Sequence, residues 1–300
     1  MIDLVSASDH VRLHRGQVIV IKVGGACLAR PALLEALARQ IAVVEACGAR
    51  LVVVHGAGPQ TDDVQRALGE EPRKVGGRRI TTPRALEALI RATRGELAPA
   101  LVEALVAAGA RAEVLCAEDC VVATRRRPVV PPPTSPLMSG DGPIDFGLVG
   151  DIRSVDPTPI RARLAAGVVP VLSPPVADDA GGRGGRLNVN ADLMAAHVAV
   201  ALGARMLVLV TSVAGVLTDP ADRGSVVSSL ALDQLAELER GGALAGGMHV
   251  KASAARLALE GGVPRVHVVS GTEPEALLGE LYTTQGTGTV LTAEPEVVPA

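Results

Sequence analysis

The chain has 300 residues, a formal net charge of −3 at pH 7 and hydrophobic side chains at 48% of its positions. This is enough for one large α/β domain or two lobes with a substantial core. Aromatic residues are nearly absent, with one Tyr, one Phe and no Trp, which argues against nucleic-acid binding by base stacking. The single arginine run, residues 125–127, is expected to lie in solvent.

Cysteine usage and the N-terminal residues favour a reducing, cytoplasmic setting. The four cysteines form no CxxC pair and no cluster with histidine, so free buried thiols are expected and no protein-made metal site. No apolar stretch reaches the roughly 20 residues that span a bilayer. No signal peptide is expected, because residues 1–16 lack a long apolar core and carry Asp3, Asp9, Arg12 and Arg15.

A rhythm of strand, glycine turn and helix runs along most of the chain and predicts a parallel sheet with right-handed crossovers. In chain order, the expected elements are a strand at 17–25, a helix at 31–47, a strand at 50–58, a helix at 82–109 interrupted near Gly95 or Pro99, a strand at 111–116, a helix at 159–168, a strand at 168–176, a helix at 191–203, a strand at 205–211, helices at 231–240 and 251–260, a strand at 265–271 and a helix at 274–281.

Two segments interrupt this rhythm. Residues 126–143 are dense in Pro, Gly and Ser, so they predict an exposed excursion, either a flap over a site or a disordered loop. Residues 178–192 form a glycine-rich loop that leads into a helix. Glycine density peaks there, so a lobe boundary is expected near 175–185.

Glycine turns after strands are candidates for anion binding, because backbone N–H groups can approach a phosphate where no Cβ intervenes. Such turns occur at Gly24-Gly25, at 56–58, before Asn188 and at Gly246-Gly247. No G-x-x-x-x-G-K-[ST] motif is present, and residues 56–61 read G-A-G-P-Q-T, which fails the dinucleotide fingerprint G-x-G-x-x-G. A phosphoryl group therefore fits these turns better than a dinucleotide.

Polar side chains accompany three of these turns, each with a structural alternative. Lys22 ends an apolar strand, where it either snorkels to solvent or meets a phosphate. Lys251 opens a helix after glycines and is either a surface lysine or a second cation of the site. Asn188, Asn190 and Asp192 stand at a loop-to-helix junction, where capping explains one of them but does not require all three.

At this point the chain resembles the N-acetylglutamate kinases of the amino acid kinase family, over about residues 10–292. The resemblance rests on seven motifs in family order: IKVGG at 21–25, VVHGAGP at 53–59, GGRRITT at 76–82, NVNAD at 188–192, LVTSVAGVL at 209–217, GGMHVKASAARLALEGGV at 246–263 and GTGTVL at 286–291.

The resemblance implies a three-layer α/β/α sandwich with a mostly parallel central sheet. It implies an N-terminal lobe, residues 1–180, that binds the acyl amino acid and forms a dimer, and a C-terminal lobe, residues 181–300, that binds ATP. The implied reaction is ATP-dependent phosphorylation of the γ-carboxylate of N-acetyl-L-glutamate in arginine biosynthesis. Mg²⁺ is implied as a cofactor held mainly by the nucleotide phosphates.

The resemblance also implies roles for individual residues. Lys22 and Lys251 match the lysines that stabilise the transferring phosphoryl group, and Asp192 matches the aspartate that organises them. The further matches are Gly56 and Ala57 at the acceptor and phosphoryl site, Arg79 and Asn188 for the acceptor's carboxylate and amide, and Gly24, Gly25, Thr211, Ser212, Gly215, Val216, Gly246 and Gly247 for the nucleotide.

Several positions depart from the family pattern. Ala57 replaces a glycine and is expected to be strained if the position needs a positive φ, and Ser212 replaces an aspartate. These departures keep two alternatives open. One is a sister kinase acting on N-acetyl-aminoadipate or a carrier-linked amino acid in lysine biosynthesis, for which Arg125–Arg127 would be the docking hint. The other is a non-catalytic arginine-sensing homologue.

The two ends of the chain resemble the arginine-inhibited members of the family. The stretch HVRLHRGQVIVIK at 10–22 is similar to their N-terminal helix and first strand, and GELYTTQGTGTVL at 279–291 is similar to their arginine-site signature. The implied candidates for an arginine site are His267, Glu280 and Gly286. A homodimer or a hexamer is expected, with no nucleic-acid or membrane partner.

Overall fold

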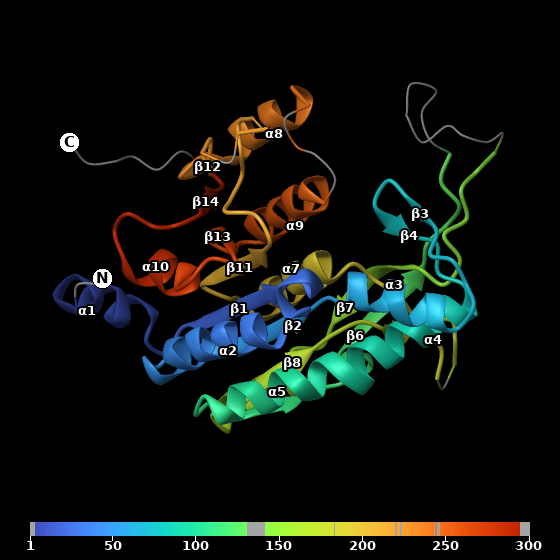
Figure 1. Ribbon diagram of the computed structural model, residues 1–300, viewed down its shortest axis with the longest axis horizontal. Coiled ribbons are helices and arrows are strands. Elements are labelled where there is room, and N and C mark those ends of the chain that lie inside the picture. Colours follow the sequence, from blue (N-terminus) through green and yellow to red (C-terminus); the bar gives the residue numbers. More distant parts are fainter. Residues whose placement is uncertain are drawn as a thin grey trace.

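The computed structural model describes residues 4–130, 142–182, 184–219, 221–222, 224–242, 244 and 247–294. Its centre is an eight-stranded sheet in which all neighbouring strands are parallel except β13 and β14. In spatial order the sheet contains β12 (Ser229–Ala231), β14 (Thr289–Thr292), β13 (Arg265–Ser270), β11 (Met206–Thr211), β1 (Val18–Val23), β2 (Arg50–His55), β8 (Val169–Leu172) and β5 (Ala112–Val114), as Figure 1 shows.

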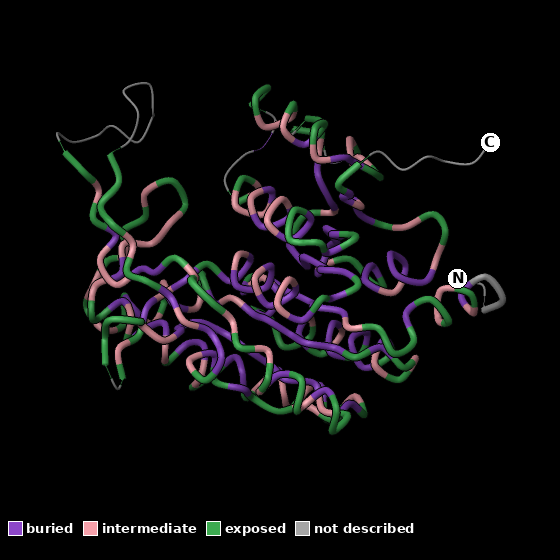
Figure 2. Tube along the Cα trace, turned by 180° about the vertical axis from the view of Figure 1, so that it is seen from behind, coloured by how far each residue is buried: buried purple, intermediate pink, exposed green. Residues whose placement is uncertain are grey.

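Helices cover both faces of this sheet, which confirms the expected three-layer α/β/α sandwich with a mostly parallel sheet. On one face lie α2 (Pro31–Ala46), α5 (Ala98–Ala107) and α10 (Ala276–Tyr282), which share an apolar cluster with alternate residues of the strands. On the other face lie α6 (Thr158–Ala165), α7 (Ala191–Leu202) and α9 (Met248–Glu260). In Figure 2 the buried residues follow the central strands and the inward faces of the helices.

The central strands are apolar on both faces because both are covered. In β1, Ile19, Ile21 and Val23 pack against the layer of α2, while Val20 packs against the layer of α7. Lys22 interrupts this pattern, yet its side chain is only 6% exposed. A lysine buried in the middle strand of a sheet requires a specific partner, since an isolated buried ammonium is costly.

Most of the remaining elements lie beside the N-terminal half of the sheet. A second sheet contains β10 (Arg186–Leu187), β9 (Val176–Asp178), β6 (Val121–Arg125) and β7 (Gly150–Val155), and β3 (Lys74–Val75) and β4 (Arg78–Arg79) form a separate hairpin. The other helices are α1 (Leu4–His14), which contacts α10, α3 (Gly58–Ala67), α4 (Pro83–Ile90) and α8 (Leu232–Arg240). Of these, α1 and α8 lie beside the C-terminal half of the sheet.

Two expected elements differ from the structure in detail. The helix expected at 82–109 is not interrupted at Gly95 or Pro99, because a π-helical stretch, Arg91–Leu97, joins α4 to α5 and contains Gly95. Pro99, which has no N–H to donate, follows this π-helical stretch in the first turn of α5. The strand expected at 168–176 is two strands, β8 and β9, separated by Pro174 and Pro175.

Most of the excursion expected at 126–143 lies outside the described residues, which omit 131–141. Its two ends are paired by hydrogen bonds between Val129 and Ile144. Within the part of the chain that the structure describes, no helix is both long and apolar enough to span a bilayer.

Candidate active site

The carboxyl ends of the parallel strands open onto a cleft of about 660 Å³. Loops that follow β1, β2 and β11 reach this cleft together with the N-terminal ends of α7 and α9. This is the edge of a parallel sheet where ligands bind. Most of the site residues expected from the sequence line it: Lys22, Gly24, Gly25, Gly56, Ala57, Arg79, Asn188, Asp192, Thr211, Ser212, Gly247 and Lys251.

At the centre of the cleft, one carboxylate lies between two ammonium groups. Lys22 Nζ is 3.0 Å from Asp192 Oδ1, and Lys251 Nζ is 3.6 Å from Asp192 Oδ2. The side chains of Lys22, Asp192 and Lys251 are 6%, 7% and 13% exposed. The structure therefore brings together the three residues for which the sequence predicted a shared role, and the group keeps one net positive charge.

Local structure explains how each of these side chains is placed. Lys22 is held in register between Val54 of β2 and Leu209 of β11, one residue before β1 ends. Asn190 caps α7 by accepting hydrogen bonds from the backbone N–H groups of Asp192 and Leu193, at 2.8 and 3.2 Å. The cap fixes the first turn of α7, so the Asp192 carboxylate is held by rigid structure.

The charges of the group follow from burial and pairing. Burial alone would raise the pKa of Asp192, but the charges of Lys22 and Lys251 hold it below its usual range, so it is ionised at neutral pH. Burial lowers the pKa of Lys251, and attraction to Asp192 opposes that shift. Burial also lowers the pKa of His55 to about 4, so the fixed positive charge beside the glycine turns comes from the lysines.

The lowered pKa of Lys251 predicts the alkaline side of the pH profile. Because the ammonium loses its proton below the ordinary 10.5 of lysine, kcat/KM for ATP will decline as pH rises toward that value. Steady-state rates measured between about pH 7 and pH 10.5 test this, since kcat/KM reports groups of the free enzyme. In Lys251→Arg the decline will move out of this range, because a guanidinium does not titrate there. An unchanged decline in that variant would assign it to another group.

The glycine turns approach the ammonium of Lys22 closely. A Cβ at Gly24 would lie 3.9 Å from Lys22 Nζ, and a Cβ at Gly56 would lie 4.0 Å from the same atom. A Cβ at Gly25 would come within 3.0 Å of both the Ala57 Cα and the Gly56 carbonyl oxygen. Side chains at these positions would crowd the space beside the ammonium, so the turns leave room there for a ligand.

The condition under which Ala57 was expected to be strained, a positive φ, is not met. Its backbone φ is −141°, which lies outside the left-handed region that favours glycine. The residue precedes α3, is 4% exposed and lines the cleft with its neighbours. This departure from the family pattern therefore provides no backbone argument for weak catalysis.

At the end of the cleft beside β4, the residues matched to the acceptor are held by specific partners. Asn188 Nδ2 donates a hydrogen bond to Thr81 Oγ1 at 3.0 Å, which fixes the amide across a long stretch of sequence. Arg79 pairs with Asp62 and donates to Gln65 Oε1 at 2.6 Å. Sequence analysis missed the partners Asp62, Gln65 and Thr81.

At the opposite end, the turn after β11 is held to β14. The backbone N–H of Val216 donates a hydrogen bond to Thr289 Oγ1 at 2.9 Å. A Cβ added at Gly215 would lie 2.5 Å from the same oxygen. Gly215 and Val216 therefore fix the turn and do not line the cleft among the described residues, whereas Thr211 and Ser212 do. Gly247 lines the cleft, and Gly246 lies outside the described residues.

The residues matched to an arginine site lie together, away from the cleft. His267 Nδ1 is 2.8 Å from Glu280 Oε1, and the backbone N–H groups of Thr287 and Gly288 donate to Glu280 Oε2 at 2.7 and 2.8 Å. Gly286 has a φ of +64°, and a Cβ there would lie 3.0 Å from the same carboxylate. The pKa of Glu280 is lowered, since these donors outweigh the effect of burial.

The sequence model of the Amino acid kinase family matches residues 17–270. The acetylglutamate kinase of Myxococcus xanthus is 40% identical over 296 residues, covering 98% of this chain and 94% of its own length. The acetylglutamate kinase of Methanoculleus marisnigri is 36% identical over 289 residues, covering 96% of this chain and 98% of its own length.

Solved structures share the fold. An N-acetylglutamate synthase from Neisseria gonorrhoeae, in complex with coenzyme A and N-acetyl-glutamate, has a TM-score of 0.81 and 28% identity and covers 98% of this chain. This chain spans 63% of that synthase's length. An isopentenyl phosphate kinase structure has a TM-score of 0.65 at 21% identity, with 92% of this chain and 100% of that chain covered. The chain belongs to the amino acid kinase family and, within it, to the acetylglutamate kinases.

Proposed function

We propose that this chain uses ATP to phosphorylate the γ-carboxylate of N-acetyl-L-glutamate, forming an acyl phosphate in arginine biosynthesis. The observation that carries the proposal is the buried group of Lys22, Asp192 and Lys251 at the centre of the cleft. The choice of acceptor is supported by relatives that match over nearly their whole length and are acetylglutamate kinases.

The chemistry explains why two lysines are needed. A carboxylate oxygen of the acceptor forms a bond to the γ-phosphorus, and the bond from that phosphorus to the bridging oxygen of ATP breaks, so ADP leaves. Both reactants are anions, and negative charge accumulates on the transferring group. Ammonium groups fixed in a buried site stabilise that charge without reorganising. The acceptor carboxylate is ionised at neutral pH, so no general base is required.

Asp192 organises this charge and does not itself react. Its two oxygens each face one lysine, so both ammonium groups are held in place while one net positive charge remains for the phosphoryl group. Mg²⁺, bound to the ATP phosphates, would neutralise further charge on the transferring group. Asp192 is occupied by the lysines, which fits a metal carried mainly by the nucleotide.

The proposed binding roles divide the chain into two lobes. Residues 1–180 bind the acceptor, with Gly56 and Ala57 beside the phosphoryl group. Arg79, together with Asn188 from the second lobe, holds the acceptor's other carboxylate and its amide. Residues 181–300 bind ATP. The nucleotide lies against Thr211, Ser212 and Gly247 of this lobe, in a turn shaped by Gly215 and Val216, and against Gly24 and Gly25 of the first lobe, with Gly246 assigned from the sequence alone.

Arginine control is a separate part of this proposal. Glu280 of α10 has a buried carboxylate that contacts His267 and lies close to Gly286, and arginine is a ligand of matching charge. A structure of the Neisseria gonorrhoeae synthase, 27% identical with a TM-score of 0.77, contains coenzyme A and L-arginine.

We further propose that the protein forms a homo-oligomer, either a dimer or a hexamer.

The test of the proposed function is trapping of the product. With MgATP and hydroxylamine, the purified protein will convert N-acetyl-L-glutamate to a hydroxamate, because hydroxylamine captures an acyl phosphate. N-acetyl-L-aminoadipate, one methylene longer, is the matched acceptor and will react at least about tenfold more slowly, as one methylene in a fitted pocket is worth that much. Faster reaction of the aminoadipate would identify the sister kinase, and no product with either acceptor would reject the proposal.

A further inference from the structure

The hairpin of β3 and β4 sets two cations directly opposite each other. Its turn residues Gly76 and Gly77 have φ values of +55° and +75°, the left-handed geometry that fits a two-residue hairpin turn. The register pairs Lys74 with Arg79, so their side chains share one face of the ribbon. Like charges in opposed positions destabilise a strand pair, so this face of the hairpin needs a compensating carboxylate.

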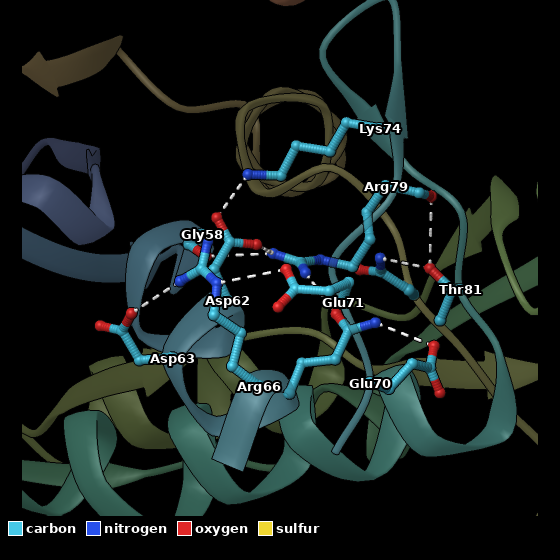
Figure 3. A network of polar contacts seen from close by, with 11 residues as sticks. Gly58, Asp62, Asp63, Arg66, Glu70, Glu71, Lys74, Arg79 and Thr81 are labelled. Atoms are coloured by element: carbon cyan, nitrogen blue, oxygen red, sulfur yellow. Dashed lines mark hydrogen bonds and ion pairs between the residues drawn. The ribbon is translucent and has the colours of Figure 1, made fainter. Parts of the chain in front are cut away.

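Asp62, in the second turn of α3, provides that carboxylate, as Figure 3 shows. Its Oδ2 is 2.6 Å from Lys74 Nζ, and its Oδ1 is 2.5 Å from Arg79 Nη2. The side chains of Asp62 and Arg79 are 15% and 8% exposed. Burial alone would raise the pKa of Asp62, but the hydrogen bond from Lys74 and the charge of Arg79 hold it below its usual range.

The guanidinium of Arg79 is fixed from further sides. Its Nη2 also donates to the Gly58 carbonyl oxygen at 3.0 Å, and its Nη1 donates to Gln65 Oε1 at 2.6 Å. Gln65 Nε2 in turn donates to Glu70 Oε1 at 2.9 Å. A carboxylate accepts hydrogen bonds, so Glu70 holds the Gln65 amide with its nitrogen toward Glu70 and its oxygen toward Arg79.

This arrangement repeats the charge pattern at the centre of the cleft. There, Asp192 lies between two lysines, and here Asp62 lies between Lys74 and Arg79. Each group of three keeps one net positive charge. Lys74 and Arg79 line the same cleft as the central group, whereas Asp62 does not line it among the described residues and acts from behind them.

Building on the proposed function, we propose that Asp62 is a positioning residue that holds Lys74 and Arg79 together as a single receptor for the acceptor's non-reacting carboxylate. One net positive charge matches one carboxylate. The second carboxylate of the acceptor then lies at the central lysines, where it is phosphorylated. The cleft is therefore built for a dicarboxylate, with one cation–carboxylate–cation group for each acidic end.

The test combines a protein change with a substrate change. Asp62→Asn keeps the shape of the side chain and removes its charge. We expect KM for N-acetyl-L-glutamate to rise, so that kcat/KM falls about tenfold or more. KM for ATP will stay within about twofold. On the acceptor analogue whose non-reacting carboxylate is a carboxamide, Asp62→Asn will reduce kcat/KM by less than about threefold, because no carboxylate then remains to be held.

Matched variants separate positioning from folding. Asp63→Asn changes the adjacent aspartate, which is 78% exposed and pairs with Arg66 of the same helix, and it will leave the kinetics with both acceptors unchanged. Glu70→Gln frees the Gln65 amide to rotate and will raise KM for N-acetyl-L-glutamate about threefold. This variant tests the same group of side chains if Asp62→Asn folds poorly. Equal losses on both acceptors, or an unchanged KM, would overturn the role of Asp62. An inactive wild-type protein would instead overturn the proposed function on which this inference rests.

Discussion

Replacing Lys22 with methionine will lower kcat by about a thousandfold, because the ammonium acts in a buried site where one donor to the transition state is worth roughly 10²–10³. Lys22 is 6% exposed and lies 3.0 Å from Asp192, so its charge is fixed before the reactants meet. Methionine has a similar length and suits an apolar strand, so the fold will be retained. Steady-state kinetics with saturating MgATP and acceptor measure the effect.

Lys22→Arg is the companion to that variant. It keeps the positive charge but changes the shape of the donor, so it will recover only part of the lost rate. The dissociation constant for ATP, measured by calorimetry, will change much less than kcat if the ammonium acts mainly in the transition state. A Lys22→Met protein with kcat within threefold of the wild type would remove this lysine from the mechanism.

Replacing Asp192 with asparagine will cause the largest loss of stability in the site, about 3–5 kcal/mol, because two buried ammonium groups then lack their shared carboxylate. The group is almost fully enclosed, with Asp192 only 7% exposed. The rate will also fall by at least about a hundredfold, since neither lysine is then held in position. Denaturant unfolding and steady-state rates on the same preparations measure both effects.

The stabilisation from Asp192 depends on pH with a definite sign. The pKa of the folded-state carboxyl is lowered from 3.8, so its contribution is fully present above that value and is lost as pH falls through the folded pKa. The stability difference between wild type and Asp192→Asn will therefore shrink in acid. Asp233→Asn, at an exposed position in the first turn of α8, is the control for the substitution itself. A difference that stays constant down to strong acid would contradict the paired carboxylate.

Much of the sandwich could be predicted because its elements carry local signals. The strands β1 and β2 are short apolar runs followed by glycine, β11 is an apolar run that ends at Thr211, and the helices between them have regular apolar spacing. Parallel strands place their carboxyl ends at one edge of the sheet, so turns distant in sequence were expected to share a site. The structure confirms this for the turns after β1 and β2.

The convergence of Lys22, Asp192 and Lys251 could not be derived from composition or spacing. Each residue has a local explanation, as a strand-end lysine, a helix-turn aspartate or a surface lysine. These are excluded only by the packing of α7 beside β1 and of α9 against α7. The expectation that they act together came from the resemblance to a known family. Burial of all three side chains is the physical reason that the local explanations fail.

The acceptor end of the cleft was the least predictable part. The pair Gly76-Gly77 between short polar strands is a hairpin signal that was available in the sequence, and it places Lys74 opposite Arg79. The docking of that hairpin on Asp62 depends on the angle between α3 and the hairpin, which no local pattern encodes. Strain at Ala57 was expected only if the position needed a positive φ, and its φ is negative, which no sequence pattern encodes.

The most direct test of the central claim is a crystal structure of the protein with MgADP, aluminium fluoride and N-acetyl-L-glutamate, in which the fluoride mimics the transferring phosphoryl group. We expect the ammonium groups of Lys22 and Lys251 to lie on the two sides of the fluoride, each within hydrogen-bond distance of it, with Asp192 between them. An aluminium fluoride group bound between nucleotide and acceptor but contacted by neither lysine would contradict the proposed role of the two lysines.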